Sequence, residues 1–389
     1  MTPDDKSPFI IFGAPDIQDA EIDEVAATLN SGWIGTGPKV AQFEQDFAAL
    51  KKVAPDRVAA VNSCTAALHV SMIAAGLEPG DEVLTSAMTF CATANAIIHA
   101  GATPVPVDID PRTLNIDTVQ LEQRITTKTR AIVPVHFAGR PCEMDQIMRI
   151  SEKHRLLIIE DCAHAIETEW QGRQAGTFGD FGCFSFYVTK NVVTGEGGMV
   201  VARSAEMIDR IKILALHGMT KDAWRRFGDE GYKHYEVVEA GFKYNMMDLQ
   251  AALGIHQLRR VEQNWQRRRE IWGRYQQAFS DLPAGRPAEP DKHTRHAYHL
   301  YTLTIDETNC GMSRDEFIAG MSSAGIGVGV HYRSLAQQPY YQSEFGWHPS
   351  DFPASTAFGD STVSLPLGPK LTDAELSRII ETVAATISR

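Results

Sequence analysis

The stretch that decides the fold is Phe184-Ser185-Phe186-Tyr187-Val188-Thr189-Lys190-Asn191, which continues into Gly195-Glu196-Gly197-Gly198. Apolar and aromatic residues lead to one lysine, and a cluster of glycines follows it. Burial disfavours the charged form of an amine, so Lys190 can lose its proton near neutral pH and form a Schiff base with an aldehyde. The glycines let the backbone pass close to a bound group. A lone lysine after a buried strand is more often a surface residue, so this interpretation depends on residues elsewhere in the chain.

An acidic residue follows another buried strand, 29 residues upstream of the lysine (190 − 161 = 29). Residues 156–159 are typical of that strand, and Glu160-Asp161-Cys162-Ala163-His164 comes directly after it. Ligands of open α/β sheets bind at the C-terminal ends of the strands, and a buried Asp161 there needs a cation. The protonated pyridine nitrogen of pyridoxal phosphate (PLP) is such a cation. Asp161 and Lys190 could therefore flank one cofactor ring.

A phosphate site is indicated where a short strand at 57–61 meets an alanine-rich helix. The joining residues are Asn62-Ser63-Cys64-Thr65-Ala66-Ala67-Leu68-His69. The free N–H groups and the dipole at the start of a helix favour a phosphate. Ser63 or Thr65 could instead be an ordinary helix N-cap. Ser185 adds a second hydroxyl close to the lysine.

The composition is that of a globular protein, with 43% hydrophobic and 22% charged residues among 389, which suggests two domains. The net charge of −12 argues against nucleic acid as a general partner. No apolar stretch is long enough to span a membrane, and the N-terminal residues do not resemble a signal peptide. The six cysteines lack the spacing of metal ligands. We therefore expect a cytoplasmic protein with reduced thiols and no metal.

Strands and helices alternate through the first half of the chain. Helices are expected at 17–30, 39–51, 65–75, 90–99, 118–125, 144–154 and 204–216, and strands at 57–61, 83–85, 104–107, 131–136, 156–159, 182–186 and 198–202. This alternation predicts an α/β fold with a mainly parallel sheet and helices on both faces. No Gly-x-Gly-x-x-Gly fingerprint follows the first strand, which argues against a nicotinamide-dependent oxidoreductase.

The regular alternation of strands and helices ends in the second half of the chain. A polar segment at 221–235 is expected near the substrate entrance, and a long helix is expected from Met246 to Phe279. After a proline-rich linker at 283–290, the pattern predicts strands at 300–305, 326–331 and 363–365 and helices at 313–324 and 372–387. These elements predict a compact α+β domain. We place a large domain at 1–255 and a small C-terminal domain at 256–389.

Several further residues are candidates for ligand contact, each with an ordinary structural alternative. Phe90 could stack on a flat cofactor or pack at a helix start. His136 could bind a ligand oxygen, although a buried core histidine is commoner, and His164 could orient Asp161 or reach the cofactor. Trp33, in the loop Trp33-Ile34-Gly35-Thr36-Gly37-Pro38, could pack on a base or sugar or anchor a turn. The pair His331-Tyr332 ends a predicted strand and could face the site.

Taken together, these segments resemble the DegT/StrS-type nucleotide-sugar aminotransferases, which are fold-type-I PLP enzymes. The likeness runs through nearly the whole chain. It rests on residues 31–38, 63–69, 160–165, 189–191 with 195–198, and 331–332, and on Gly241-Phe242-Lys243-Tyr244-Asn245. Each motif alone is weak, whereas the combination is specific.

The resemblance implies a role for each residue. Lys190 would be the Schiff-base lysine and proton shuttle, and Asp161 would pair with the pyridinium nitrogen. Phe90 would stack on the ring, and His164 would lie beside it. The phosphate would be held by Ser63, Cys64, Thr65 and Ser185, and by Asn245 of the neighbouring subunit in a homodimer. Trp33, Lys243, His331 and Tyr332 would bind substrate. Cys64 departs from the glycine of many relatives, which is harmless if only its N–H binds.

The resemblance also implies a reaction: transfer of the amino group of L-glutamate to carbon 4 of a nucleoside-diphosphate keto sugar. Residues 217–219, 222–224 and 325–332 favour that branch, with a 4-keto-pentose or a 4-keto-6-deoxyhexose as acceptor. The alternatives are amination at carbon 3, a dehydratase and a non-catalytic PLP-fold regulator. Dehydratases of this family carry histidine in place of the lysine, so Lys190 favours transamination.

Overall fold

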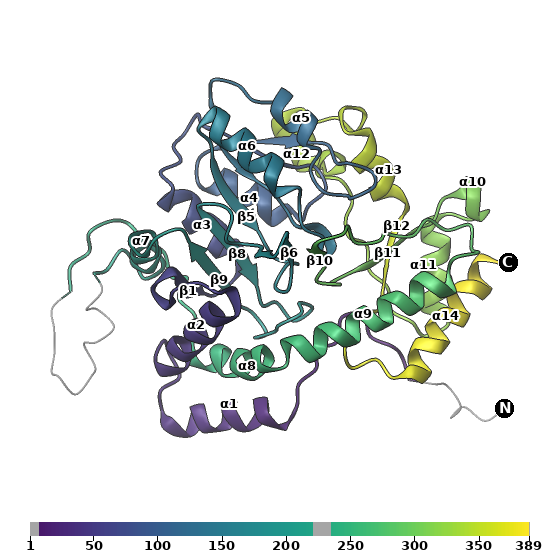
Figure 1. The fold of residues 1–389 in the computed structure, drawn as a ribbon, viewed down its shortest axis with the longest axis horizontal. Coiled ribbons are helices and arrows are strands. Elements are labelled where there is room, and N and C mark those ends of the chain that lie inside the picture. The colour runs from purple at the N-terminus through teal and green to yellow at the C-terminus, as the bar shows by residue number, and fades with distance from the viewer. Residues whose placement is uncertain (1–7, 221–234, 389) are drawn as a thin grey trace.

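A computed structural model describes residues 8–220 and 235–388 (Figure 1). The expected polar segment at 221–235 lies outside the described residues, apart from Tyr235. At the centre is a seven-stranded sheet in the order β1-β9-β8-β5-β4-β2-β3. Its strands are β1 (Val58–Val61), β2 (Glu82–Ser86), β3 (Thr103–Val107), β4 (Thr129–Val133), β5 (Leu157–Asp161), β8 (Phe181–Ser185) and β9 (Gly198–Ala202).

The sheet is mainly parallel, which confirms the α/β prediction. Strands β3, β2, β4, β5 and β8 run parallel to one another, whereas β9 lies antiparallel to both β8 and β1. Each face of the sheet has its own hydrophobic core. Val83 packs in the core on one face and the next residue, Leu84, in the core on the other, and both are fully buried. Both faces of the sheet are therefore covered, as the continuous apolar strands require.

Helices cover the two faces. One core is shared by the sheet with α3 (Cys64–Ala74), α4 (Cys91–His99) and α7 (Ala205–Ala215). The cores of the other face involve α2 (Pro38–Lys51), α5 (Thr118–Gln123), α6 (Met144–His154) and α8 (Asp248–Arg259). Helix α1 (Asp19–Ser31) packs on α8 and ends at Gly32, whose φ of 73° places it in the left-handed region. These helices agree with the predictions, whose boundaries differ by a few residues.

The aromatic residues before the lysine are anchored by α2. Phe47 of α2 packs edge-on against Phe184, with ring centroids 5.0 Å apart, and Phe43 packs against Phe186 at the same distance. All four side chains are fully buried. Burying a phenylalanine contributes about 1.5–3 kcal/mol. The residues that lead to Lys190 are thus held by the core.

The C-terminal residues form a second core. It is built on β11 (Tyr301–Thr304) and β12 (Thr362–Leu365), which pair antiparallel, with α9 (Val261–Ala278), α11 (Arg314–Ser323) and α14 (Asp373–Ile387). Short elements complete the chain: β6 (Glu169–Trp170), β7 (Arg173–Gln174), β10 (Thr294–Arg295), α10 (Glu307–Cys310), α12 (Pro339–Phe345) and α13 (Pro353–Ser361). Strand β10 pairs antiparallel with β6, which lies between β5 and β8 in the sequence.

Two expectations for this half are wrong. The single helix expected from Met246 to Phe279 is broken at Arg260, because α8 packs in the core on the large sheet whereas α9 packs in the C-terminal core. The strand expected at 326–331 is reduced to isolated bridges, Ile10 with Ile326 and Gly329 with Ser364. The expected domain boundary at 255 falls within α8 and stays a prediction.

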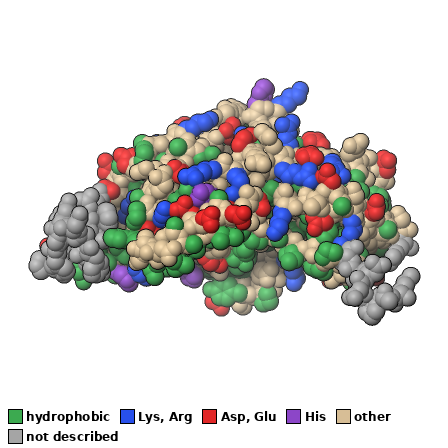
Figure 2. All heavy atoms as spheres, turned by 90° about the horizontal axis from the view of Figure 1, so that it is seen from below, with side chains coloured by type: hydrophobic (Ala, Val, Ile, Leu, Met, Phe, Trp, Pro, Cys, Tyr) green, Lys and Arg blue, Asp and Glu red, His purple; other side chains and the backbone are tan. Residues whose placement is uncertain are grey.

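The two parts are packed closely together. Asp108, directly after β3, accepts hydrogen bonds from the backbone N–H groups of Ala354 and Ser355 at the start of α13. On the face seen in Figure 2, acidic and basic side chains are interspersed. Among the described residues, the helices lack the combination of length and apolar character that crossing a bilayer requires. All six cysteines are free thiols.

Candidate active site

A cavity of about 530 Å³ lies where the C-terminal ends of β5 and β8 meet the start of α3. Ten of the residues expected at the site line it: Ser63, Cys64, Thr65, Phe90, Asp161, His164, Ser185, Lys190, His331 and Tyr332. They come from five separate segments of the chain. The predicted meeting of Lys190 and Asp161 at one cavity is therefore what the structure shows.

Asp161 ends β5 and is 4% exposed. Its Oδ2 accepts a hydrogen bond of 2.8 Å from Thr93 Oγ1, and its Oδ1 accepts one of 3.0 Å from the N–H of Ala163. Burial raises the pKa of the Asp161 carboxyl, and the two donors and the charge of Lys190 oppose that rise. A buried carboxylate with two neutral donors still gains from a cationic partner in the cavity.

Lys190 lies five residues beyond β8, in a turn where its N–H donates to the carbonyl of Tyr187 at 2.8 Å. Burial lowers the pKa of its amine from 10.5 to about 8, while the nearby Cys64 and Asp161 act in the opposite sense. The amine makes no hydrogen bond within residues 8–220 and 235–388. A substantial neutral fraction near pH 8 makes it both a nucleophile and a base.

The start of α3 forms another wall. Ser63 is the N-cap, and its Oγ accepts from the N–H of Ala66 at 3.1 Å, so the capping alternative holds for this hydroxyl. The backbone N–H groups of Cys64 and Thr65, in the first turn, have no partner within the helix. Gly198 of β9 approaches closely, because a Cβ there would lie 2.7 Å from the nitrogen of Cys64. The N–H groups of this wall can donate hydrogen bonds to the oxygens of an anionic group.

The hydrogen bonds around His164 fix where its proton lies. The N–H of Ala138 donates to Nδ1 of His164 at 3.2 Å, so Nδ1 carries the lone pair. Burial lowers the pKa of His164 well below its usual value, so the ring is neutral with its proton on Nε2. Nε2 lies 3.1 Å from Oη of Tyr332 and donates to it. The phenol proton of Tyr332 is then left for another acceptor, and Tyr332 lines the cavity.

Three expected residues do not line the cavity of this chain. Trp33 is 39% exposed, with its Nε1 donating to the carbonyl of Thr36 at 3.1 Å. Lys243 is exposed, and Nδ2 of Asn245 donates to Oγ1 of Thr36 at 2.6 Å. Thr36 thus contacts both Trp33 and Asn245. The roles of Trp33, Lys243 and Asn245 at the site stay predictions.

The structure adds residues that the sequence did not single out. Thr93 donates a hydrogen bond to Asp161, and its Oγ1 also lies 2.8 Å from Oγ1 of Thr89. In the sequence, the only indication of this contact is that the two threonines lie four residues apart around the start of α4. His299 stacks on His164 with ring centroids 4.3 Å apart, and no local pattern pointed to it. His136 is fully buried against Glu160, so its core alternative is the one observed.

The comparisons with known proteins agree with this geometry. Residues 15–384 match the DegT/DnrJ/EryC1/StrS aminotransferase family. The spore coat polysaccharide biosynthesis protein SpsC of Bacillus subtilis is 48% identical over 376 residues, 96% of each chain. The PMP form of the putative sugar aminotransferase Spr1654 from Streptococcus pneumoniae superposes with a TM-score of 0.90 at 36% identity, covering 98% of each chain. DesI, solved in the presence of its TDP-sugar product, gives 0.87 at 30% identity, covering 98% of this chain and 94% of DesI. The chain belongs to the DegT/DnrJ/EryC1/StrS family and is a PLP-dependent sugar aminotransferase of fold type I.

Proposed function

We propose that this enzyme moves the amino group of L-glutamate to carbon 4 of a nucleoside-diphosphate keto sugar, in a homodimer with shared active sites. The observation that carries the proposal is the meeting of Lys190, Asp161 and the first turn of α3 at one cavity. An amine, a carboxylate and an anion-binding helix start together match the aldehyde, ring nitrogen and phosphate of PLP. PLP, when bound, supplies the electron sink that lets an amino group pass from donor to acceptor.

The residues of this chain fit that cofactor. Asp161, with burial favouring a cationic partner, would hold the ring nitrogen protonated. The N–H groups of Cys64 and Thr65 would bind the phosphate, with the hydroxyls of Thr65 and Ser185 beside them. Phe90, which is 56% exposed and 5.7 Å from the ring of Tyr332, would cover one side of the cofactor ring. Each of these roles is a proposal about a named side chain.

Lys190 would carry the proton. Its amine, with a pKa of about 8, would move a proton from the α-carbon of glutamate to the cofactor in the first half of the reaction, and a proton from the cofactor to the sugar carbon in the second half. Tyr332, whose hydroxyl is free to donate, would hydrogen-bond an oxygen of the bound substrate or cofactor. His331, whose Nδ1 lies 2.9 Å from Oγ of Ser364, is held at the same wall. These two residues would orient the acceptor.

A sugar nucleotide as acceptor is supported by the family and by the relatives. DesI has a TDP-sugar product, and SpsC takes part in polysaccharide biosynthesis. Position 4 rests on the likeness of residues 217–219 and 325–332 to that branch of the family. Residues 222–224, which favour the same branch, lie outside the described part of the chain. The expectation of a cytoplasmic enzyme stays a prediction.

The dimer is supported by three expected site residues that do not line the cavity of Lys190 and Asp161 in their own chain. Trp33, Lys243 and Asn245 lie apart from the cavity of this chain, and Oδ1 of Asn245 has no hydrogen-bond partner among the described residues. Ile34 and Met247 are exposed beside them, at 48% and 44%. A second copy seated on this surface would cover these apolar side chains and could receive Asn245 at its cofactor phosphate.

The test is a panel of UDP- and dTDP-linked keto sugars with the keto group at carbon 3 or at carbon 4. Holoenzyme is first incubated with glutamate, and 2-oxoglutarate release is measured. Each sugar is then added, and loss of the pyridoxamine absorbance identifies the acceptor. We expect turnover with a 4-keto sugar. Turnover with 3-keto sugars alone would overturn the position, deoxygenation without 2-oxoglutarate would indicate a dehydratase, and binding without turnover would indicate a regulator.

A further inference from the structure

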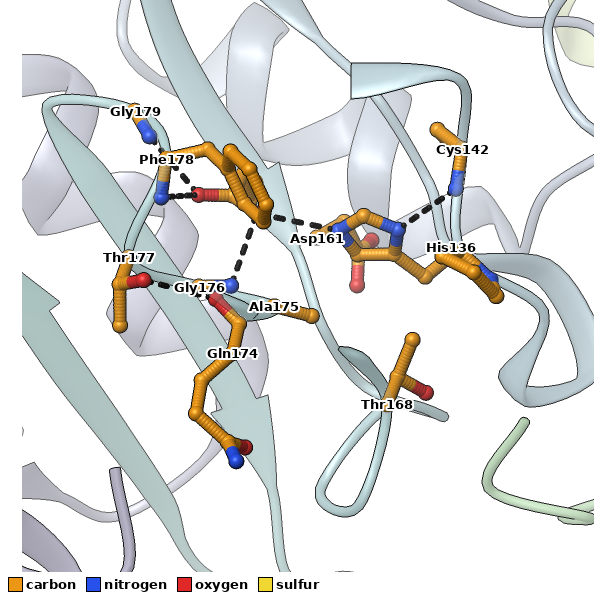
Figure 3. Close-up of polar contacts among 12 residues, drawn as sticks. His136, Cys142, Asp161, Thr168, Gln174, Ala175, Gly176, Thr177, Phe178 and Gly179 are labelled. Atoms are coloured by element: carbon orange, nitrogen blue, oxygen red, sulfur yellow. Dashed lines mark hydrogen bonds and ion pairs between the residues drawn. The ribbon is translucent and has the colours of Figure 1, made fainter. Parts of the chain in front are cut away.

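The residue directly before Asp161 is a fully buried acid. Glu160 is 0% exposed, and because side chains alternate along β5, it lies on the opposite face of the sheet from Asp161. Its carboxylate accepts four hydrogen bonds: from Gly176 N at 2.7 Å and His136 Nε2 at 3.1 Å on Oε2, and from Phe178 N at 2.7 Å and Gly179 N at 2.8 Å on Oε1. Figure 3 shows the four donor residues, with Gly176, Phe178 and Gly179 on one side and His136 on the other.

The direction of each hydrogen bond follows from the groups involved. Three of the donors are backbone N–H groups, which can only donate. His136 accepts a hydrogen bond at Nδ1 from the N–H of Cys142 at 3.0 Å, so its own proton lies on Nε2 and points at Glu160 (Figure 3). An ionised carboxylate can accept all four protons, whereas a carboxamide would turn an NH₂ group toward two of them. The site is therefore built for the anion.

This carboxylate joins three segments of the chain in the middle of the sheet. His136 follows β4, Glu160 belongs to β5, and the turn 176–179 leads into β8, which carries Ser185 toward Lys190. The turn is packed tightly on β5: a Cβ at Gly179 would lie 2.4 Å from the carbonyl oxygen of Ile158. The end of β4, the end of β5 and the start of β8 are thus tied to one buried carboxylate.

The same segments hold the backbone of Asp161. The N–H of His136 donates to the carbonyl of Asp161 at 3.2 Å. On the other side, the N–H of Cys162 donates to the carbonyl of Cys183 in β8 at 2.8 Å. A movement of His136 or of β8 would carry the Asp161 carboxylate with it, and in a site of this kind a shift of about 1 Å is enough to impair function.

We propose that Glu160 is a positioning residue: its buried carboxylate holds the end of β4, the end of β5 and the start of β8 together and so sets the place of Asp161 in the cavity. The inference rests on the proposed role of Asp161 at the cofactor ring. Glu160 does not line the cavity, and it acts through the backbone that it shares with Asp161. The PLP affinity of the apoenzyme is therefore the property that it controls.

The variant that tests this is Glu160→Gln, with Asp108→Asn as the matched control. Asp108 is also buried at the end of a parallel strand and accepts backbone N–H groups, those of Ile109, Ala354 and Ser355, but it has no contact with Asp161. Titration of each apoenzyme with PLP gives the dissociation constant, and thermal unfolding gives the midpoint. Both variants should lower the midpoint, and only Glu160→Gln should weaken PLP binding, by about tenfold or more.

A double-mutant cycle with Asp161→Asn separates positioning from general loosening of the fold. If Glu160 acts through Asp161, adding Glu160→Gln to Asp161→Asn should change the PLP dissociation constant by less than about twofold. A second loss equal to that of Glu160→Gln alone would overturn the inference. Normal PLP affinity of Glu160→Gln overturns it as well, with the role of Asp161 intact. Normal affinity of Asp161→Asn overturns both proposals.

If Glu160→Gln does not fold, two further measurements keep the inference open to refutation. His136→Gln removes one of the four donors and should weaken PLP binding in the same sense, though less. In the native apoenzyme, the amide protons of Gly176, Phe178 and Gly179 should exchange as slowly as those of β5. Fast exchange of these amides, or unchanged PLP affinity of His136→Gln, would contradict the proposed tie.

Discussion

Nε2 of His164 lies 3.1 Å from Oη of Tyr332, although 168 residues separate them in the chain. The contact joins the end of β5 to the segment between α11 and α12. Because the N–H of Ala138 occupies Nδ1 of His164, the imidazole donates and the phenol keeps its own proton for the cavity. The pair makes Tyr332 a hydrogen-bond donor with a fixed direction.

Replacing Tyr332 by phenylalanine should therefore lower kcat by about ten- to a hundredfold. It should also lower the unfolding midpoint, because the buried Nε2–H of His164 loses its acceptor. The ring and its packing remain, while the hydroxyl is lost both as a donor to the cavity and as the acceptor for Nε2 of His164. Steady-state kinetics with the best sugar acceptor would measure the effect. Tyr340→Phe, at a tyrosine that is 51% exposed, is the control and should behave as the native enzyme. Equal kinetics for the two variants would contradict a donor role for Tyr332.

Lys190→Ala should abolish turnover and remove the visible absorbance that depends on a covalent bond between the lysine and PLP. Lys153→Ala is the control, because Lys153 is exposed and forms an ion pair with Glu122, away from the cavity. The pH dependence offers a second measurement. With a pKa of about 8, the neutral amine becomes abundant as pH rises through 8, so PLP should incorporate into the apoenzyme faster at pH 9 than at pH 7. A rate independent of pH would contradict this.

The sequence predicted those site residues that belong to a short local pattern. A buried strand followed by an acid predicted Asp161, and an apolar segment ending in one lysine predicted Lys190, because each signal spans fewer than ten residues. The parallel sheet followed from the alternation of strands and helices. These parts depend on burial and periodicity, which neighbouring residues determine.

Contacts between distant segments could not be predicted in this way. Nothing near Tyr332 in the sequence indicates His164, and the four donors around Glu160 come from two other segments that only the folded sheet brings together. The break between α8 and α9 was missed for a similar reason. Helical periodicity continues through Arg260, but the two halves bury against different cores, and Arg260 forms an ion pair with the fully buried Glu21 at 2.6 Å.

A second buried lysine gives a prediction about stability. Lys51 is 1% exposed, and its Nζ donates to the carbonyls of Ile166 at 2.7 Å and Ala175 at 3.2 Å. Burial lowers its pKa from 10.5 to about 8. Below pH 8 the charge is present in both folded and unfolded chains and costs the folded state about 3 kcal/mol. Between pH 8 and 10.5 the unfolded chain binds more protons, so this group makes stability rise with pH.

Lys51→Met should reduce that rise. The free energy of unfolding of the apoenzyme, measured with urea at pH 7.5 and pH 9.5, should increase less with pH in the variant than in the native protein. Lys153→Met, at an exposed lysine, should leave the increase unchanged. Part of the rise should remain in Lys51→Met, since Lys190 also has a lowered pKa. An increase as large as in the native protein would show that Lys51 does not titrate in this range.

The shared active site can be tested by complementation between inactive chains. If Asn245 serves the cofactor phosphate of the partner, Asn245→Asp places a negative charge against that phosphate and should cut activity to below about a tenth. Lys190→Ala is inactive for a separate reason. A heterodimer of the two variants has one site in which both residues are native, so co-expression with random pairing should restore about a quarter of the native activity. Separately purified variants, mixed without subunit exchange, are the control. Co-expressed chains no more active than that mixture would place Asn245 in the site of its own chain or in none.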